Sequence, residues 1–440
     1  MRTRIVIAGL AAVGALGWAA TARATNGMDL EGYGPIAHGQ GGASLASDNG
    51  TAAVINNPAT LSLMPDGASR IDVAFGMLGP DVEASMPGMP TAHSNGDSYF
   101  MPAFGYITRQ GDFSYGIGVF GQGGMGTRFA GTSFLALNSG EPVMSEVSVG
   151  RLIAPLSYRV SDSLSVAGTL DFLWAGMDMR MAMTAPQAMG MLSGMPTLAM
   201  PALGANNYLR VDFADGSQFT GDAMGYGADV KVGALYHVTS RVRVGVIYHA
   251  EPELGDLESK DATLSFGDMV TGTQMGSVEG EVKVHDFRWP AMFGGGVAVD
   301  ATDRLTLSLD VKRIMWEDVM NSMDMTFTAD AGGSVSFSLP QAWEDQTVWC
   351  IGAAFKATDV LTLRAGYNYG ESPVPEANVN PLFPAIVEHH ITAGASYAID
   401  DQNSVHLSVV YAPENDVTAA SGVTSTHSQF NGQVMYSYTF

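Results

Sequence analysis

From residue 69 to the C-terminus, apolar and polar residues alternate in segments of about ten residues. Residues 361–369, LTLRAGYNY, show this most clearly, because every second residue is aliphatic or aromatic. Residues 305–312 and 405–409 repeat the pattern. Alternation puts one kind of side chain on each face of a β-strand. Strands of this kind, with one apolar face, are typical of transmembrane β-barrels.

Short polar turns alternate with long connections along this region. The turns fall at residues 109–112, 160–163, 238–241, 300–303, 357–359 and 400–403. The long connections fall near residues 80–97, 122–144, 181–220, 252–279, 317–344, 372–385 and 414–426. Six turns and seven long connections separate fourteen strands, and this asymmetry is typical of outer-membrane barrels. We therefore expect an all-β fold, a fourteen-stranded antiparallel transmembrane β-barrel over residues 69–440.

The last strand supports a membrane location. Aromatic or branched side chains recur at alternate positions up to the C-terminus, at Phe430, Val434, Tyr436, Tyr438 and Phe440. Such a row is typical of the aromatic girdle of a barrel. A soluble β-sandwich, the alternative, would need a second sheet to cover this face.

Residues 25–68 break the alternation. They are rich in glycine and small residues and contain the triplet Asn57, Pro58 and Ala59. Asparagine is a favoured helix cap and proline a favoured first helical residue, so a short helix is expected from Pro58. The segment is compact and irregular, and we expect it to form a plug inside the barrel.

The N-terminus and the charge limit the possible locations and partners. Residues 1–24 combine arginines, an apolar run and a small-x-small end, which predicts a cleaved signal peptide. Removing its three arginines changes the net charge from −23 to −26, which argues against nucleic acid as a partner. The single cysteine, Cys350, excludes an internal disulfide.

Two motifs resemble those of the FadL/TodX family of outer-membrane transporters for hydrophobic compounds. Residues 46–59, ASDNGTAAVINNPA, resemble the family's plug motif. Leu363 and Arg364, followed by residues 371–375, ESPVP, resemble its strand-to-loop motif. The resemblance extends from the plug to Phe440.

The resemblance implies that residues 25–68 form a hatch domain and that long extracellular loops capture an apolar ligand. It also implies release through the barrel wall at a kink in the third strand, expected from Phe113 to about Gly124. Gly116, Gly118 and Gly121 are the candidate positions of this lateral gate, because glycine inside a strand often marks a bend. Long-chain fatty acids or hydrocarbons are the implied ligands.

Methionines are the candidate ligand-binding residues. Strand parity predicts that Met177, Met179 and Met181 face the lumen. The uncharged third long loop offers a capture surface made of Met189, Met191, Leu192, Met195, Leu198, Met200 and Leu203. Plain loop packing is the simpler alternative. A Cu(I) site is disfavoured because no Cys or His lies among them, so we expect no metal and no cofactor.

Parity also places three cations in the lumen, Arg243, Lys312 and Arg364. They either meet a ligand carboxylate or belong to a paired, wet interior. The sequence contains no Gly-x-Ser-x-Gly motif and no phosphate-binding loop. We therefore expect a passive, hatch-gated channel in a Gram-negative outer membrane. The expected partners are a hydrophobic ligand, membrane lipid and lipopolysaccharide, and the expected state is a monomer. A general porin and a lipid-acting enzyme are the alternatives.

Overall fold

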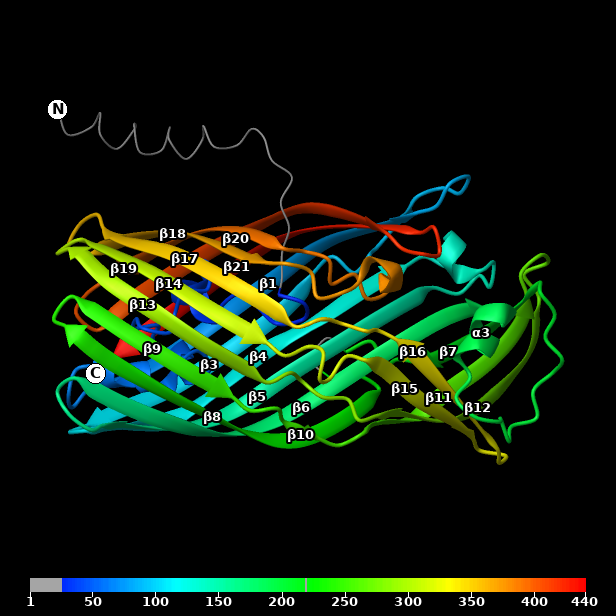
Figure 1. Ribbon diagram of the computed structural model, residues 1–440, viewed down its shortest axis with the longest axis horizontal. Helices are drawn as coiled ribbons and strands as arrows, with labels where there is room; N and C mark the ends of the chain where they lie inside the picture. Colours follow the sequence, from blue (N-terminus) through cyan, green and yellow to red (C-terminus); the bar gives the residue numbers. More distant parts are fainter. Residues whose placement is uncertain (1–25, 218–219) are drawn as a thin grey trace.

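The alternating segments form one antiparallel sheet that closes on itself. The computed structural model describes residues 26–217 and 220–440, so the expected signal peptide lies outside the described residues. β1 (Ser69–Ser85) pairs with β3 (Tyr99–Gln110) on one side and with the last strand, β21 (Thr424–Thr439), on the other. Because the first and last strands are joined, the sheet is a closed barrel (Figure 1).

The wall continues from β3 through antiparallel neighbours back to β21. These strands are β4 (Phe113–Phe129), β5 (Val143–Arg159), β6 (Leu164–Thr184), β8 (Ala223–Thr239), β9 (Val242–His249), β13 (Met292–Thr302), β14 (Leu305–Ile314), β17 (Gln346–Lys356), β18 (Leu361–Gly370), β19 (His389–Ala398) and β20 (Asn403–Thr418). Their apolar faces point outward, as Phe172, Phe430 and Tyr436 show by their exposure. The side chains on the inward faces of these strands therefore make the packing contacts inside the barrel.

The predicted count of fourteen strands is wrong, because the sheet contains 21 strands among the described residues. The additional strands lie in the long connections. They are β2 (Ala92–His93), β7 (Asn207–Phe213), β10 (Glu253–Leu254), β11 (Leu257–Asp268), β12 (Gln274–His285), β15 (Ser322–Ala329) and β16 (Ser334–Pro340). β7 pairs with both β6 and β11, and β12 pairs with β15, so these segments are ordered extensions of the sheet. β7, β11, β12, β15 and β16 lie at the long-loop end of the barrel, opposite the short turns (Figure 1).

The N-terminal segment, residues 26–64, lies inside the wall and is mostly buried. It contains α2 (Gly34–His38) and two 3-10 helices, η1 (Ala52–Val54) and η2 (Pro58–Leu63). The loops carry η3 (Phe134–Ala136), α3 (Ala185–Met191) and η4 (Glu376–Asn378). None of the described helices is long and apolar enough to cross a membrane.

Charged wall residues hold the backbone of the N-terminal segment. Asp310 accepts hydrogen bonds from the amides of Ser44 and Leu45 at 2.6 and 3.0 Å. Lys231 donates to the carbonyl of Ile55 at 2.6 Å. The wall also approaches closely at Gly245, where a Cβ atom would lie 1.8 Å from the Leu45 carbonyl oxygen. Charge-assisted bonds of this kind are stronger than neutral ones, so the segment is firmly attached.

Candidate functional site

The wall is interrupted between β3 and β4. Their pairing ends at Phe104 and Val119. Beyond that point β3 continues to Tyr99 alongside β1, and β4 continues to Phe129 alongside β5. The two strands therefore separate within a wall that is otherwise continuous on both sides.

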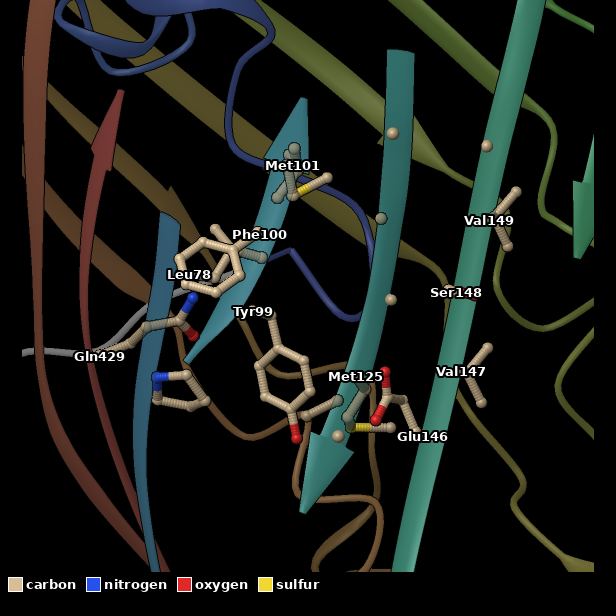
Figure 2. A pocket seen from close by; sticks show the side chains of 18 of the residues that line it. Leu78, Tyr99, Phe100, Met101, Met125, Glu146, Val147, Ser148, Val149 and Gln429 are labelled. Atoms are coloured by element: carbon tan, nitrogen blue, oxygen red, sulfur yellow. The ribbon is translucent and has the colours of Figure 1, made fainter. Parts of the chain in front are cut away.

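A cavity of about 180 Å³ occupies this gap. Its lining includes Phe100 and Val119, on the outward faces of their strands, and also Met101 and Phe120, on the inward faces. Figure 2 shows Tyr99 and Phe100 projecting into the space between β1 and β4. Side chains from both faces of the wall therefore line this cavity.

Glycines in β4 keep this cavity open. The register of β4 against β5 shifts between Gly121 and Gly123, which marks a bulge. A Cβ atom at Gly121 would lie 2.6 Å from the Met101 side chain, and one at Gly126 would lie 2.4 Å from the Tyr99 hydroxyl. Side chains at these positions would fill the cavity.

The cavity is mainly apolar. Among the described residues no lysine or arginine lines it, and its acidic and basic side chains are Glu146 and His427. One carboxylate oxygen of Glu146 is buried and has no hydrogen-bond partner among the described residues. Figure 2 shows Glu146 next to Met125, beside β4 and β5. The described lining therefore offers a carboxylate ligand no permanently charged lysine or arginine.

The start of the N-terminal segment closes the inner side of the cavity, where Gly27 and Leu30 belong to the lining. The Met28 carbonyl accepts a hydrogen bond from the Gly124 amide at 3.0 Å. The Tyr33 hydroxyl lies 2.6 Å from an Asp29 carboxylate oxygen and 2.7 Å from the Gln122 carbonyl. The N-terminal segment and the bulged part of β4 are therefore directly linked.

A buried charge cluster lies deeper in the lumen. The carboxylates of Asp171 and Asp229 and the ring of His249 are close enough to share a metal ion. Arg151 already lies 3.0 Å from Asp171 and 2.7 Å from Asp229, and it also contacts Gln122. The guanidinium supplies the positive charge between the carboxylates, so the arrangement is that of a buried ion-pair network.

The plug motif adopts the expected cap. The Asn57 side-chain oxygen accepts from the Ala59 amide at 3.1 Å, and Pro58 begins η2. The Asn57 side-chain NH₂ donates to the Leu45 carbonyl at 2.7 Å and to the wall at the Ala234 carbonyl at 3.3 Å. The Asn57 side chain therefore makes hydrogen bonds within the N-terminal segment and also connects that segment to β8.

The predicted methionine groups separate in the structure. Met177, Met179 and Met181 are buried on the inward face of β6, in agreement with their parity. Of the predicted capture residues in the third long loop, Met189 and Met195 are strongly exposed. The remaining predicted capture residues pack against the interior, namely Met191, Leu192, Leu198, Met200 and Leu203.

The predicted cations lie away from the wall cavity. Lys312 is buried and donates to the Gly42 carbonyl at 3.3 Å. Arg243 and Arg364 line a different, polar cavity at the short-turn end. Of the three candidate gate glycines, Gly116 and Gly118 lie in the paired part of β4, and Gly121 lines the wall cavity.

Sequence reasoning missed most of the wall cavity. The residues it did not single out include Tyr99, Phe100, Met101, Met125, Glu146 and Trp174. The sequence feature that indicated an irregular strand here is the glycine density of residues 121–126, GQGGMG, which is unusual inside a strand. Most other side chains of the wall cavity come from β1, β3 and β5. Their positions around the cavity depend on where the pairing between β3 and β4 ends.

The fold is that of an outer-membrane transport barrel, and comparison with known proteins agrees. The family model for outer membrane protein transport proteins (OMPP1/FadL/TodX) matches residues 13–438. The chain belongs to this family. Its members and solved neighbours are transport proteins of the outer membrane, not enzymes.

Two solved structures are similar over nearly their whole length. The toluene transporter TodX of Pseudomonas putida is 28% identical, with a TM-score of 0.83, over 94% of this chain and 99% of that chain. The toluene transporter TbuX of Ralstonia pickettii is 28% identical, with a TM-score of 0.76, over 93% of this chain and 99% of that chain.

Curated relatives match over shorter stretches. A 47 kDa outer membrane protein of Pasteurella multocida is 24% identical over 204 residues, which cover 43% of this chain. The chain spans less than half the length of the curated relatives it matches, 35% and 44%.

Proposed function

We propose that this protein takes up neutral hydrophobic compounds across the outer membrane by passive diffusion and releases them sideways through the opening between β3 and β4. The observation that carries this proposal is the cavity lined by residues from both faces of the wall, including Phe100 and Met101. An apolar molecule that leaves through the wall enters lipid directly and avoids the polar, short-turn end of the lumen.

The lining chemistry favours neutral ligands over fatty acids. A carboxylate that leaves water needs a cation or several hydrogen-bond donors. The wall cavity contains no lysine or arginine, and its carboxyl group, Glu146, would oppose a second one. The similar barrels TodX and TbuX are described as toluene transporters. We therefore assign neutral hydrocarbons as the substrate class.

The N-terminal segment acts as the hatch in this proposal. Charged wall residues such as Asp310 and Lys231 hold its central part. Gly27 and Leu30 line the passage itself, and this end is joined to β4 through the Met28 carbonyl. Gating therefore needs movement of residues 26–30 only, while the rest of the segment blocks the lumen. The loop surface with Met189 and Met195 is the proposed first contact for the ligand.

The Gly121→Leu variant tests the release route. A leucine there must displace the flexible end of Met101 and fill the passage, without a backbone clash. Uptake of radiolabelled toluene by cells lacking other transporters should fall at least tenfold. Gly295→Leu is the matched control, because it adds the same side chain to a strand position with open space. Equal uptake by Gly121→Leu and the parent would contradict lateral release.

A further inference from the structure

A second and larger cavity lies at the short-turn end of the barrel. Its volume is about 710 Å³, within the range of small-molecule sites. Gln40, Ser47 and Asp48 of the N-terminal segment cover its inner side, and strand ends form its walls. It shares no lining residue with the wall cavity. Exposed side chains at the turns, including Arg304, place its mouth on the periplasmic side, where outer-membrane barrels have their short turns.

The charge of this cavity is opposite to that of the chain. The protein has 21 lysines and arginines against 44 acidic residues. The described cavity lining contains six lysine or arginine side chains, three acidic side chains and His406. The lysine and arginine side chains are Arg70, Arg241, Arg243, Arg304, Lys356 and Arg364. A concentration of positive charge in a strongly acidic protein calls for a specific explanation.

Each of the three carboxylates forms an ion pair with an arginine. Asp48 lies 3.1 Å from Arg70. Arg243 binds both carboxylate oxygens of Asp300, at 3.0 and 3.2 Å. The remaining acid, Asp303, lies 2.6 Å from Arg241. Three positive charges are therefore left in excess.

The excess cations lie in one part of the sheet, Arg304 in the turn before β14, Lys356 at the end of β17 and Arg364 on β18. Arg304, Lys356 and Arg364 have no ion pair within the part of the chain that the structure describes. The Lys356 amide donates to the Arg304 carbonyl at 2.8 Å, and Lys356 is paired with Thr362, two residues before Arg364. Arg364 donates to the Ser396 hydroxyl at 2.5 Å, while its buried Nε has no hydrogen-bond partner. The Ser396 hydroxyl is also bonded to Nδ1 of His406 at 2.6 Å, so the unused donor at this point is the buried Nε of Arg364.

We propose that this cavity is a periplasmic binding site for a small anion that carries two or more carboxylate or phosphate groups. Such groups accept paired hydrogen bonds from arginine and balance the three excess charges. Entry is from the short turns, and the N-terminal segment separates the site from the path of the apolar substrate.

Calorimetric titration of the purified mature protein in detergent tests the site. The probes are citrate, inorganic phosphate and pyrophosphate, with glycerol as the uncharged control. Saturable binding of an anion, weakened by salt, is the expected result. Preference for citrate or for the phosphates decides between a carboxylate and a phosphate ligand. Absence of saturable binding for all three anions would overturn the proposal.

A charge variant separates a built site from general attraction. Arg304→Gln combined with Lys356→Gln removes two exposed cations that make no ion pair, so the barrel should still fold. Anion affinity should fall at least tenfold. Arg159→Gln is the matched control, because Arg159 lies at the same barrel end, pairs with Asp162 and does not line the cavity. Equal loss in the double variant and the control, or no loss in the double variant, would contradict the assignment.

Discussion

The two cavities of this barrel use opposite chemistry. The wall cavity between β3 and β4 is mainly apolar, and its described lining contains Glu146 and His427 but no lysine or arginine. The cavity at the short turns is larger and has an excess of three positive charges. The N-terminal segment, β1 and β21 contribute to both linings, and the N-terminal segment lies between the two cavities. An apolar ligand and a polar solute would therefore follow separate routes, which this segment keeps apart.

The largest expected effect comes from displacing the N-terminal segment. In the Gly245→Val variant the added side chain would meet the Leu45 carbonyl, a backbone atom that cannot yield. The N-terminal segment should therefore be displaced from β9, and the two cavities should then connect to form an aqueous channel. Liposome swelling with sugars should accelerate at least tenfold.

Gly295→Val is the control for this variant, because open space surrounds Gly295 on the neighbouring strand. It should leave sugar permeability at the low level of the parent. Rapid sugar flux through the parent protein itself would contradict the separation of the routes and favour a general porin.

A charge reversal in the wall cavity should change substrate preference. Glu146→Lys places a permanent cation in a lining whose described residues include no lysine or arginine, so a fatty acid carboxylate gains a partner. The ratio of oleate to toluene uptake should rise about tenfold, which corresponds to about 1.4 kcal/mol. Glu146→Gln is the control and should leave oleate uptake low. An unchanged ratio in the lysine variant would show that this cavity does not select the substrate.

Acid should loosen the N-terminal segment. Burial raises the pKa of Glu31, but the ring of His38, 2.6 Å away, outweighs burial and lowers it to about 2 from the usual 4.5. The folded state therefore binds fewer protons than the unfolded state between these values. Stability contributed by Glu31 is complete above pH 4.5 and is lost as the pH falls through 2, by on the order of 3 kcal/mol.

Hydrogen exchange of residues 31–42 in detergent, corrected for intrinsic rates, measures this change. Protection should decrease from pH 5 to pH 2 in the parent and depend less on pH in Glu31→Gln. Identical pH profiles for the two proteins would exclude Glu31 as the titrating group.

The smallest expected effect concerns the long-loop end. Met189 and Met195 together changed to serine remove two exposed apolar side chains and leave the packed residues of the same loop intact. A weak first contact would then be lost, lowering toluene uptake about twofold at low concentration only. Met191→Ser is a comparison variant that affects loop packing. Equal uptake across all concentrations would assign the loop methionines to packing alone.

The sequence was informative wherever local pattern decides structure. Alternation identified a barrel wall, and the parity of Met177 and Met179 placed them inside. Asn57 and Pro58 marked the start of η2. Local chemistry was sufficient in these cases because strand parity and helix caps depend on near neighbours along the chain.

The sequence was insufficient wherever pairing over long distances decides structure. The paired strands β11, β12, β15 and β16 were expected as loops, since their alternation covers short stretches within long connections. The wall cavity depends on where β3 and β4 stop pairing, and on Tyr99 and Glu146 from separate strands. Parity placed Arg243 and Arg364 inside the barrel but gave no position along its axis, so their separation from the apolar cavity was not foreseen.

A reversible crosslink across the wall opening tests lateral release most directly. A Cβ atom at Gly121 would lie 3.9 Å from the Met101 Cβ, which suits a disulfide between cysteines at these positions. The native Cys350 is buried and does not interfere. In the Met101→Cys, Gly121→Cys protein, toluene uptake should be abolished when oxidised and restored by dithiothreitol. Equal uptake in the oxidised and reduced states, with the crosslink verified by mass spectrometry, would contradict release through the wall.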